Sequence, residues 1–123
     1  MLILGGPDEC KQNKRLSDKF NFVKHTGCNN SILEFAHIIN LCDLIVTCDT
    51  FALHVATAFN KIVIALFGPT SLSEIHLYNN GIKLKAESEC NCFYQQSCKE
   101  SVSCMEKISA VKVLESIKKL LSN

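Results

Sequence analysis

The sequence lacks a strong charge of either sign, since its 123 residues carry a formal net charge of only +1. A broad electropositive surface is therefore not expected, and neither nucleic acid nor an anionic membrane is favoured as a partner. No apolar run approaches the roughly 20 residues that a transmembrane helix needs. The apolar residues 1–4 are followed at once by Gly5-Gly6-Pro7, so they predict neither a signal peptide nor a membrane anchor. These absences favour a cytoplasmic protein.

Internal repeats, linkers and low-complexity tracts are also missing, and the length fits one domain with its own hydrophobic core. Short apolar runs alternate along the chain with segments of helical periodicity. We expect strands near residues 1–4, 22–25, 44–46, 62–67 and 82–85, and helices near 9–20, 31–39, 50–59, 71–78 and 109–121. This alternation with short connections predicts an α/β fold, with a Rossmann-like parallel sheet and helices on both faces.

Two of the expected strands end in polar clusters. Asp49-Thr50 follows one strand, and Phe67-Gly68-Pro69-Thr70 ends the next. Ligands of parallel-sheet proteins bind at the carboxyl ends of strands, and the N–H groups at a helix N-terminus favour phosphate. Asp49 would repel phosphate and better suits sugar hydroxyls, and His54 follows it by about one and a half helical turns. The structural alternative is that Asp49 and Thr50 are N-caps and that His54 is a partly buried helix residue. The second cluster favours the functional interpretation.

Four of the eight cysteines crowd into one stretch, at Cys90, Cys92, Cys98 and Cys104. Four thiolates suit a structural zinc ion, which can fold a loop that has no core of its own. The spacing differs from the paired C-x2-C of zinc ribbons, so reduced thiols, an iron–sulfur cluster and, in an oxidising compartment, two disulfides stay open.

The remaining cysteines and histidines carry less weight. Cysteines scattered through an α/β body are usually small buried hydrophobes, and this is expected for Cys10, Cys28, Cys42 and Cys48. Three histidines have no partner at ligand spacing, so surface or satisfied-core positions are expected for His25, His37 and His76.

The segment from Asp49 to His54 and the Phe-Gly-Pro-Thr turn together resemble glycosyltransferase family 9, the heptosyltransferase family. The family pattern there is D-T-G-x-x-H-x-A-x-A, then a strand, then F-G-P-T. The resemblance covers nearly the whole chain. Residues 4–9 are similar to the family's L-G-G-x-x-E, and residues 104–108 to the C-M-x-x-I that ends a cysteine-rich segment. This resemblance implies that the chain is the C-terminal, donor-binding lobe of a two-lobed GT-B enzyme, incomplete at its N-terminus.

The resemblance also implies roles for individual residues. Donor binding falls on Asp49, Thr50, Phe51, His54 and Thr70. Asp8 or Glu9 would bind the ribose hydroxyls, and Asn30 and Ser31 would lie near the base. The residues themselves leave alternatives, because Asp8 and Glu9 also complement a helix dipole and Asn30 or Ser31 also suits an N-cap. No catalytic residue is assigned, since the family's proposed base lies in the other lobe.

The implied organisation is a single nucleotide-sugar-binding domain over residues 1–123. An α/β body at 1–87 is followed by a cysteine-rich loop at 88–106 and a closing helix at 107–123. The implied donor is ADP-heptose-like. The implied enzyme is bacterial and transfers the sugar, with inversion, to lipopolysaccharide core or a related surface glycan. The implied reaction uses no catalytic metal or cofactor. The acceptor would bring the enzyme to the inner membrane as a peripheral protein.

Three departures from the family pattern leave a second function open. Phe51 stands where the family has Gly. The family's preceding strand, with its hydroxyl residues and a lysine near the pyrophosphate, has no counterpart, and the acceptor lobe is absent. The chain alone is therefore expected to be inactive, as a fragment or half of a split enzyme. The alternative is a non-catalytic nucleotide-binding or interaction module. An unrelated zinc-loop α/β protein would explain the cysteines but not the Asp49 cluster.

Overall fold

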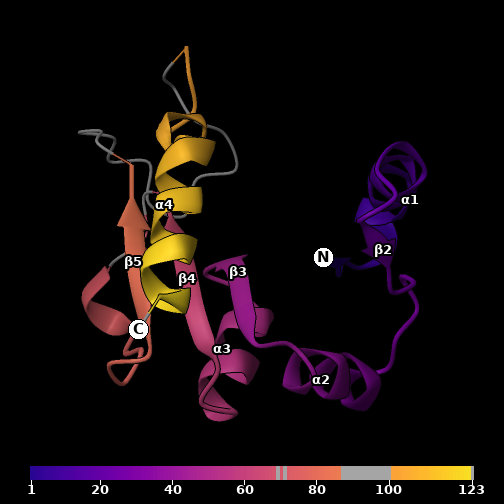
Figure 1. The fold of residues 1–123 in the computed structure, drawn as a ribbon, viewed down its shortest axis with the longest axis horizontal. Coiled ribbons are helices and arrows are strands. Elements are labelled where there is room, and N and C mark those ends of the chain that lie inside the picture. The colour runs from indigo at the N-terminus through magenta and orange to yellow at the C-terminus, as the bar shows by residue number, and fades with distance from the viewer. Residues whose placement is uncertain (69, 71, 87–100, 123) are drawn as a thin grey trace. The chain divides into compact units, whose positions relative to one another are not determined.

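The computed structural model describes residues 1–68, 70, 72–86 and 101–122. The chain forms two compact units, Met1–Ile38 and Ile39–Asn123 (Figure 1). Each unit is built from parallel strands and helices. The organisation as one domain over the whole chain stays a prediction.

The first unit is a strand–helix–strand motif. Strands β1 (Leu2–Ile3) and β2 (Lys24–His25) pair in parallel, with Ile3 opposite His25. Between them lie the short 3-10 helix η1 (Pro7–Glu9) and helix α1 (Cys10–Lys19), and α1 packs on β2. Helix α2 (Ile32–Asn40) follows and runs into the second unit.

The second unit contains a three-stranded parallel sheet in the order β3-β4-β5. Its strands are β3 (Leu44–Cys48), β4 (Ile62–Phe67) and β5 (Gly81–Lys85). Helix α3 (Phe51–Ala58) connects β3 to β4, and the 3-10 helix η2 (Leu72–Glu74) precedes β5. The 3-10 helix η3 (Met105–Lys107) leads into helix α4 (Ala110–Leu121).

The core of this unit lies around β4. Val63, Ile64 and Ala65 are all buried although they are consecutive. Since successive side chains of a strand point to opposite faces, both faces of the sheet must be covered. Helix α3 packs on β3 and β4, and α4 packs on β4 and β5 (Figure 1). The predicted α/β architecture with helices on both faces is confirmed in this unit.

Most predicted elements are confirmed to within a few residues, but two features differ. The parallel strands form two sheets among the described residues, where one sheet was expected. The helix expected near 71–78 is only the short η2. Tyr78 and Asn79 have positive φ angles of 49° and 64°, which a right-handed helix cannot contain.

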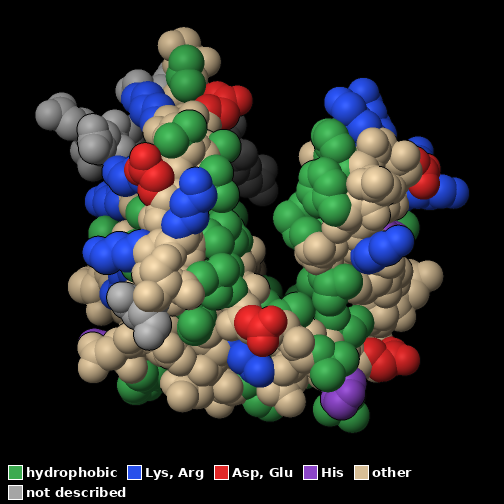
Figure 2. Space-filling model, viewed as in Figure 1, with side chains coloured by type: hydrophobic (Ala, Val, Ile, Leu, Met, Phe, Trp, Pro, Cys, Tyr) green, Lys and Arg blue, Asp and Glu red, His purple; other side chains and the backbone are tan. Residues whose placement is uncertain are grey.

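Helix α4 carries apolar side chains that its own sheet does not cover. Val111, Leu114 and Leu121 are exposed, and their spacing places them on one side of the helix. Figure 2 shows hydrophobic side chains at the surface of both units. In the part of the chain that the structure describes, no helix is long and apolar enough to cross a membrane.

Candidate functional site

The Asp49-Thr50 pair lies at the carboxyl end of β3. Cys48 ends that strand opposite Leu66 of β4, so the turn lies beside the carboxyl end of its neighbour. Thr50 occupies the N-cap position of α3 in extended conformation, with φ −142° and ψ 175°. Asp49 and Thr50 are both exposed. The pair is therefore accessible at the edge of the sheet where parallel α/β proteins bind ligands.

The hydroxyl of Thr50 does not cap the helix that it precedes. It lies 3.1 Å from the hydroxyl of Thr47, which in turn donates a hydrogen bond to the carbonyl of Cys48 at 3.2 Å. The N-cap alternative thus holds for the backbone of Thr50 but not for its side chain. A helix N-terminus without a side-chain cap stays suited to an anionic group from outside the chain.

His54 faces an open pocket of about 330 Å³ beside α3. The pocket is lined by His54, Thr57, Ala58, Glu74, Ile75, His76 and Tyr78. His54 is exposed, so the alternative of a partly buried histidine is wrong. The pocket is at the small end of the range for ligand sites, about 300–1,000 Å³. It brings a second histidine, His76, to the same place as His54, which sequence spacing did not indicate.

Gly68 is present for packing and not for an unusual dihedral angle. A Cβ atom at Gly68 would lie 3.1 Å from the Sγ atom of Cys104 and 3.2 Å from the Sδ atom of Met105. Among the described glycines only Gly27 has a positive φ angle. Gly68 therefore needs no positive φ angle, and a side chain there would crowd residues 104–105. Thr70 is half-buried just beyond it.

The two acidic residues predicted to bind ribose, Asp8 and Glu9, differ in their contacts. The Oε2 atom of Glu9 accepts a hydrogen bond from the backbone N–H of Gly6 at 2.7 Å. Asp8 is exposed, and no hydrogen bond or ion pair holds it within the described part of the chain. Asn13, one turn into α1, is only 6% exposed, and its amide nitrogen has no partner among the described residues. Glu9 thus serves the local turn, while Asp8 stays available.

Asn30 and Ser31 both make local structural contacts. The amide of Asn30 donates to the carbonyls of Thr26 and Gly27 at 3.3 and 3.4 Å. Ser31 and Glu34 cap α2 reciprocally, with the Ser31 N–H donating to the Glu34 carboxylate at 2.8 Å. Hydrogen bonds from Ser31 lower the pKa of Glu34. The predicted cap at Ser31 is confirmed, and a contact of either residue with a base stays a prediction.

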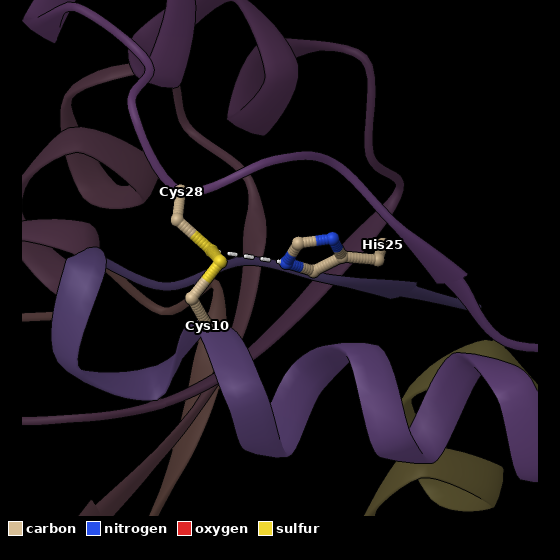
Figure 3. Close-up of side chains that lie close together, drawn as sticks. All are labelled: Cys10, His25 and Cys28. Atoms are coloured by element: carbon tan, nitrogen blue, oxygen red, sulfur yellow. Dashed lines mark hydrogen bonds between the residues drawn. A yellow bond between two sulfur atoms is a disulfide. The ribbon is translucent and has the colours of Figure 1, made fainter.

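A third group, Cys10, His25 and Cys28, was not predicted as a site (Figure 3). Cys10 and Cys28 form a disulfide, and the Nε2 atom of His25 lies 3.2 Å from the Sγ atom of Cys28. The expectation that His25 has no partner is wrong, and Cys10 and Cys28 are not separate buried hydrophobes. The H-x2-C spacing of His25 and Cys28 was the available signal.

Comparison with known proteins shows to which family the chain belongs. The sequence model of glycosyltransferase family 9 (heptosyltransferase) matches residues 2–108. The chain belongs to this family. A search of curated protein sequences finds no match.

Two solved structures share the fold of this family 9 chain. E. coli ADP-heptose lps heptosyltransferase II matches with a TM-score of 0.71 at 19% identity, over 98% of this chain and 36% of that enzyme. E. coli heptosyltransferase WaaC with ADP-2-deoxy-2-fluoro heptose matches with a TM-score of 0.72 at 20% identity, over 96% of this chain and 32% of that enzyme. The chain thus spans about a third of the length of these heptosyltransferases.

The predicted residues of this family 9 chain fall into separate groups. The first unit holds Asp8, Glu9, Asn30 and Ser31, and the second holds Asp49, Thr50, Phe51, His54 and Thr70. Of the four cysteines predicted to bind zinc, Cys90, Cys92 and Cys98 lie outside the described residues. Cys104 is buried and carries a free thiol. Zinc at that loop stays a prediction.

Proposed function

We propose that this chain is the donor-binding part of a heptosyltransferase-like enzyme that binds a nucleotide sugar of the ADP-heptose type. The observation that carries the proposal is the exposed Asp49-Thr50 pair at the carboxyl end of β3 in a family 9 chain. One of the solved relatives is described with an ADP-heptose analogue.

The second unit would hold the diphosphate and the sugar. The diphosphate would lie at the N-terminus of α3, where backbone N–H groups favour an anion. The Asp49 carboxylate would accept hydrogen bonds from sugar hydroxyls, because it has acceptor oxygens and no donor. Thr50, His54 and Thr70 would complete the donor contacts.

The first unit offers its own candidate contacts for a nucleoside. Asp8 has the uncommitted carboxylate and is our choice for the vicinal ribose hydroxyls. Glu9 commits its Oε2 atom to Gly6, so it would act mainly by fixing the turn that carries Asp8. Asn30 and Ser31 would lie near the base while keeping their contacts with the loop and α2.

Transfer itself would need residues beyond this chain. An inverting displacement requires an acceptor hydroxyl and a base held in line with the anomeric carbon. We assign these to an acceptor lobe that binds lipopolysaccharide core or a related surface glycan. The assembled enzyme would act in the cytoplasm at the inner membrane, held there by its acceptor.

The direct test compares Asp49→Asn with Asp43→Asn. Asp43 and Asp49 flank the same strand, β3, at its opposite ends, and both are exposed. Loss of a hydrogen bond to a charged group costs about 1.5–3 kcal/mol, which is roughly ten- to a hundredfold in affinity. Calorimetric titration with an ADP-sugar should show that loss for Asp49→Asn and none for Asp43→Asn. Unchanged binding by Asp49→Asn, or no binding by the parent chain, would contradict the proposal.

Phe51 supports the second candidate, a nucleotide-binding module without transfer activity. Its side chain is 53% exposed at the first position of α3, where the family pattern has Gly. A ring at this position would prevent the close approach of a diphosphate to the backbone that Gly allows, so the sugar of a donor would not be positioned for transfer. For such a module we expect ADP and ADP-sugar to bind equally well, with Asp49→Asn affecting neither. Donor binding instead predicts a preference for the ADP-sugar that depends on Asp49.

A further inference from the structure

We propose that Cys10, His25 and Cys28, in the reduced chain, bind one zinc ion and leave a fourth coordination position open. The ligand atoms of the three side chains all lie within 4.8 Å of one another. They come from three different places: the start of α1, strand β2 and the loop after β2 (Figure 3). This site is independent of the donor-binding proposal.

The backbone around the histidine and the second cysteine is fixed by hydrogen bonds. His25 pairs with Ile3 across the two-stranded sheet. The backbone N–H and the hydroxyl of Thr26 both donate to the Ile3 carbonyl, at 3.3 and 3.2 Å. Gly27 adopts a φ of 88°, which lets the chain turn tightly, and the Asn30 amide braces that turn. The Nε2 atom of His25 and the Sγ atom of Cys28 are thereby held close together, 3.2 Å apart.

The first unit has a small core, so a covalent or metal cross-link would stabilise it. Within Met1–Ile38 the buried side chains are those of Asn13 and Val23. Domains of about 40 residues or fewer usually need a metal, disulfides or a partner, because their cores are too small. A bond network joining α1 to the loop after β2 would supply that stabilisation. Either a disulfide or a metal ion could do so from these positions.

Two observations favour the metal. In the disulfide form the Nε2 atom of His25 contacts a sulfur atom, which is a weak hydrogen-bond acceptor. Two thiolates and an imidazole, in contrast, are a zinc donor set. Cys48 is exposed and carries a free thiol. Exposed free thiols fit a reducing compartment, in which a Cys10–Cys28 disulfide would itself be reduced.

The Cys10–Cys28 disulfide must be reduced before zinc can bind. A cellular thiol or dithiol reductant supplies two electrons and two protons, which break the Cys10–Cys28 bond and give two thiols. Zinc then replaces the two thiol protons, which pass to solvent, and takes the lone pair of neutral His25. The Cα atoms of the cysteines are 5.7 Å apart. A small outward movement of the two sulfur atoms would make room for the ion.

The experiment uses the full chain with Cys90, Cys92 and Cys98 replaced by Ser, so that the other candidate zinc ligands are removed. After reduction with dithiothreitol and its removal, cobalt is titrated in and followed by thiolate-to-cobalt absorption, then displaced by zinc. We expect one ion per chain. His25→Gln should weaken binding by at least the roughly 10–100-fold that even loss of an outer-shell partner costs. Cys10→Ser and Cys28→Ser should remove most of the thiolate absorption.

Matched controls are His37→Gln and Cys48→Ser, which change an exposed histidine and an exposed cysteine elsewhere and should leave binding unchanged. Zinc should also raise the melting temperature of the reduced parent but not that of His25→Gln, which separates binding from misfolding. Absence of cobalt absorption in the reduced parent would overturn the proposal and leave a plain disulfide. Equal affinity in His25→Gln would also overturn it.

Discussion

The Sγ atom of Cys104 lies 3.1 Å from the point that a Cβ atom would occupy at Gly68. The residue after β4 is thus in direct contact with the segment that leads into α4, although the two are far apart in the sequence. Cys104 is only 5% exposed, so this contact belongs to the core of the second unit. It links the Phe-Gly-Pro-Thr turn to the cysteine-methionine pair, two motifs that the sequence presents separately.

We expect Gly68→Ala to destabilise the chain. The added methyl group overpacks the contact with Cys104 and Met105, which typically costs about 1–3 kcal/mol. Gly6→Ala is the control, because its nearest neighbour would be the flexible Glu9 carboxylate at 3.4 Å and its φ is −86°. Urea unfolding should show a loss for Gly68→Ala and little change for Gly6→Ala. Equal stability of the two variants would contradict the packing argument.

The thiol of Cys48 should report on the charge of Asp49. Desolvation raises the pKa of Cys48, and the neighbouring Asp49 carboxylate raises it further. A raised pKa means less thiolate at a given pH, so Asp49→Asn should lower that pKa and speed alkylation of Cys48 by iodoacetamide. Peptide mass spectrometry against pH measures this rate.

Asp43→Asn is the reciprocal control for that experiment. Desolvation and then Asp43 raise the pKa of Cys42. Asp43→Asn should therefore speed alkylation of Cys42 and leave Cys48 unchanged. Parallel responses of both cysteines to either variant would show a general loosening of the unit and not a local charge effect.

Ser31 should determine how much the ionised Glu34 carboxylate stabilises the fold, and at which acidic pH this stabilisation is lost. Hydrogen bonds from Ser31 lower the pKa of Glu34. A carboxyl group with a lowered folded pKa stabilises the fold above its unfolded pKa, and this is lost as pH falls through the folded value. Ser31→Ala should raise the Glu34 pKa in a carbon-detected NMR titration and flatten this pH dependence of unfolding. An unchanged Glu34 titration would contradict the capping geometry.

Asn13→Leu should stabilise the chain if Asn13 has only a structural position. Its buried amide nitrogen has no partner among the described residues, and an unsatisfied buried group costs about 1–3 kcal/mol. Leu branches at the same carbon as Asn and favours helix more. Gln12→Leu on the exposed neighbouring position is the control. If Asn13→Leu is more stable but no longer binds nucleotide, the Asn13 amide is a ligand contact. If Asn13→Leu is less stable, the buried amide does not carry the expected energetic cost.

Much of the secondary structure was predictable because it depends on local patterns. β4 was predicted at residues 62–67 and is found there. Ser109 was predicted to start the closing helix, and its hydroxyl accepts a hydrogen bond from the N–H of Lys112 as an N-cap. Hydrophobic periodicity and capping act over a few residues, so they can be read without knowing the fold.

The candidate site was predictable only in part. The position of Asp49-Thr50 after a strand follows from the order of elements, and the structure agrees. The bond between the hydroxyls of Thr47 and Thr50, the pocket that brings His76 to His54, and the reason for Gly68 were not predicted. Each depends on how a loop returns to a strand or helix, which spacing along the chain does not specify.

The sequence by itself determined the α/β alternation, the exposed acidic turn after β3 and the similarity to family 9. Only the tertiary structure decided that Cys10, His25 and Cys28 meet. Strands β1 and β2 pair in parallel and are connected through α1. This pairing places His25 and Cys28 next to Cys10, the first residue of α1. Local periodicity predicts each element, but strand pairing determines which distant side chains come into contact.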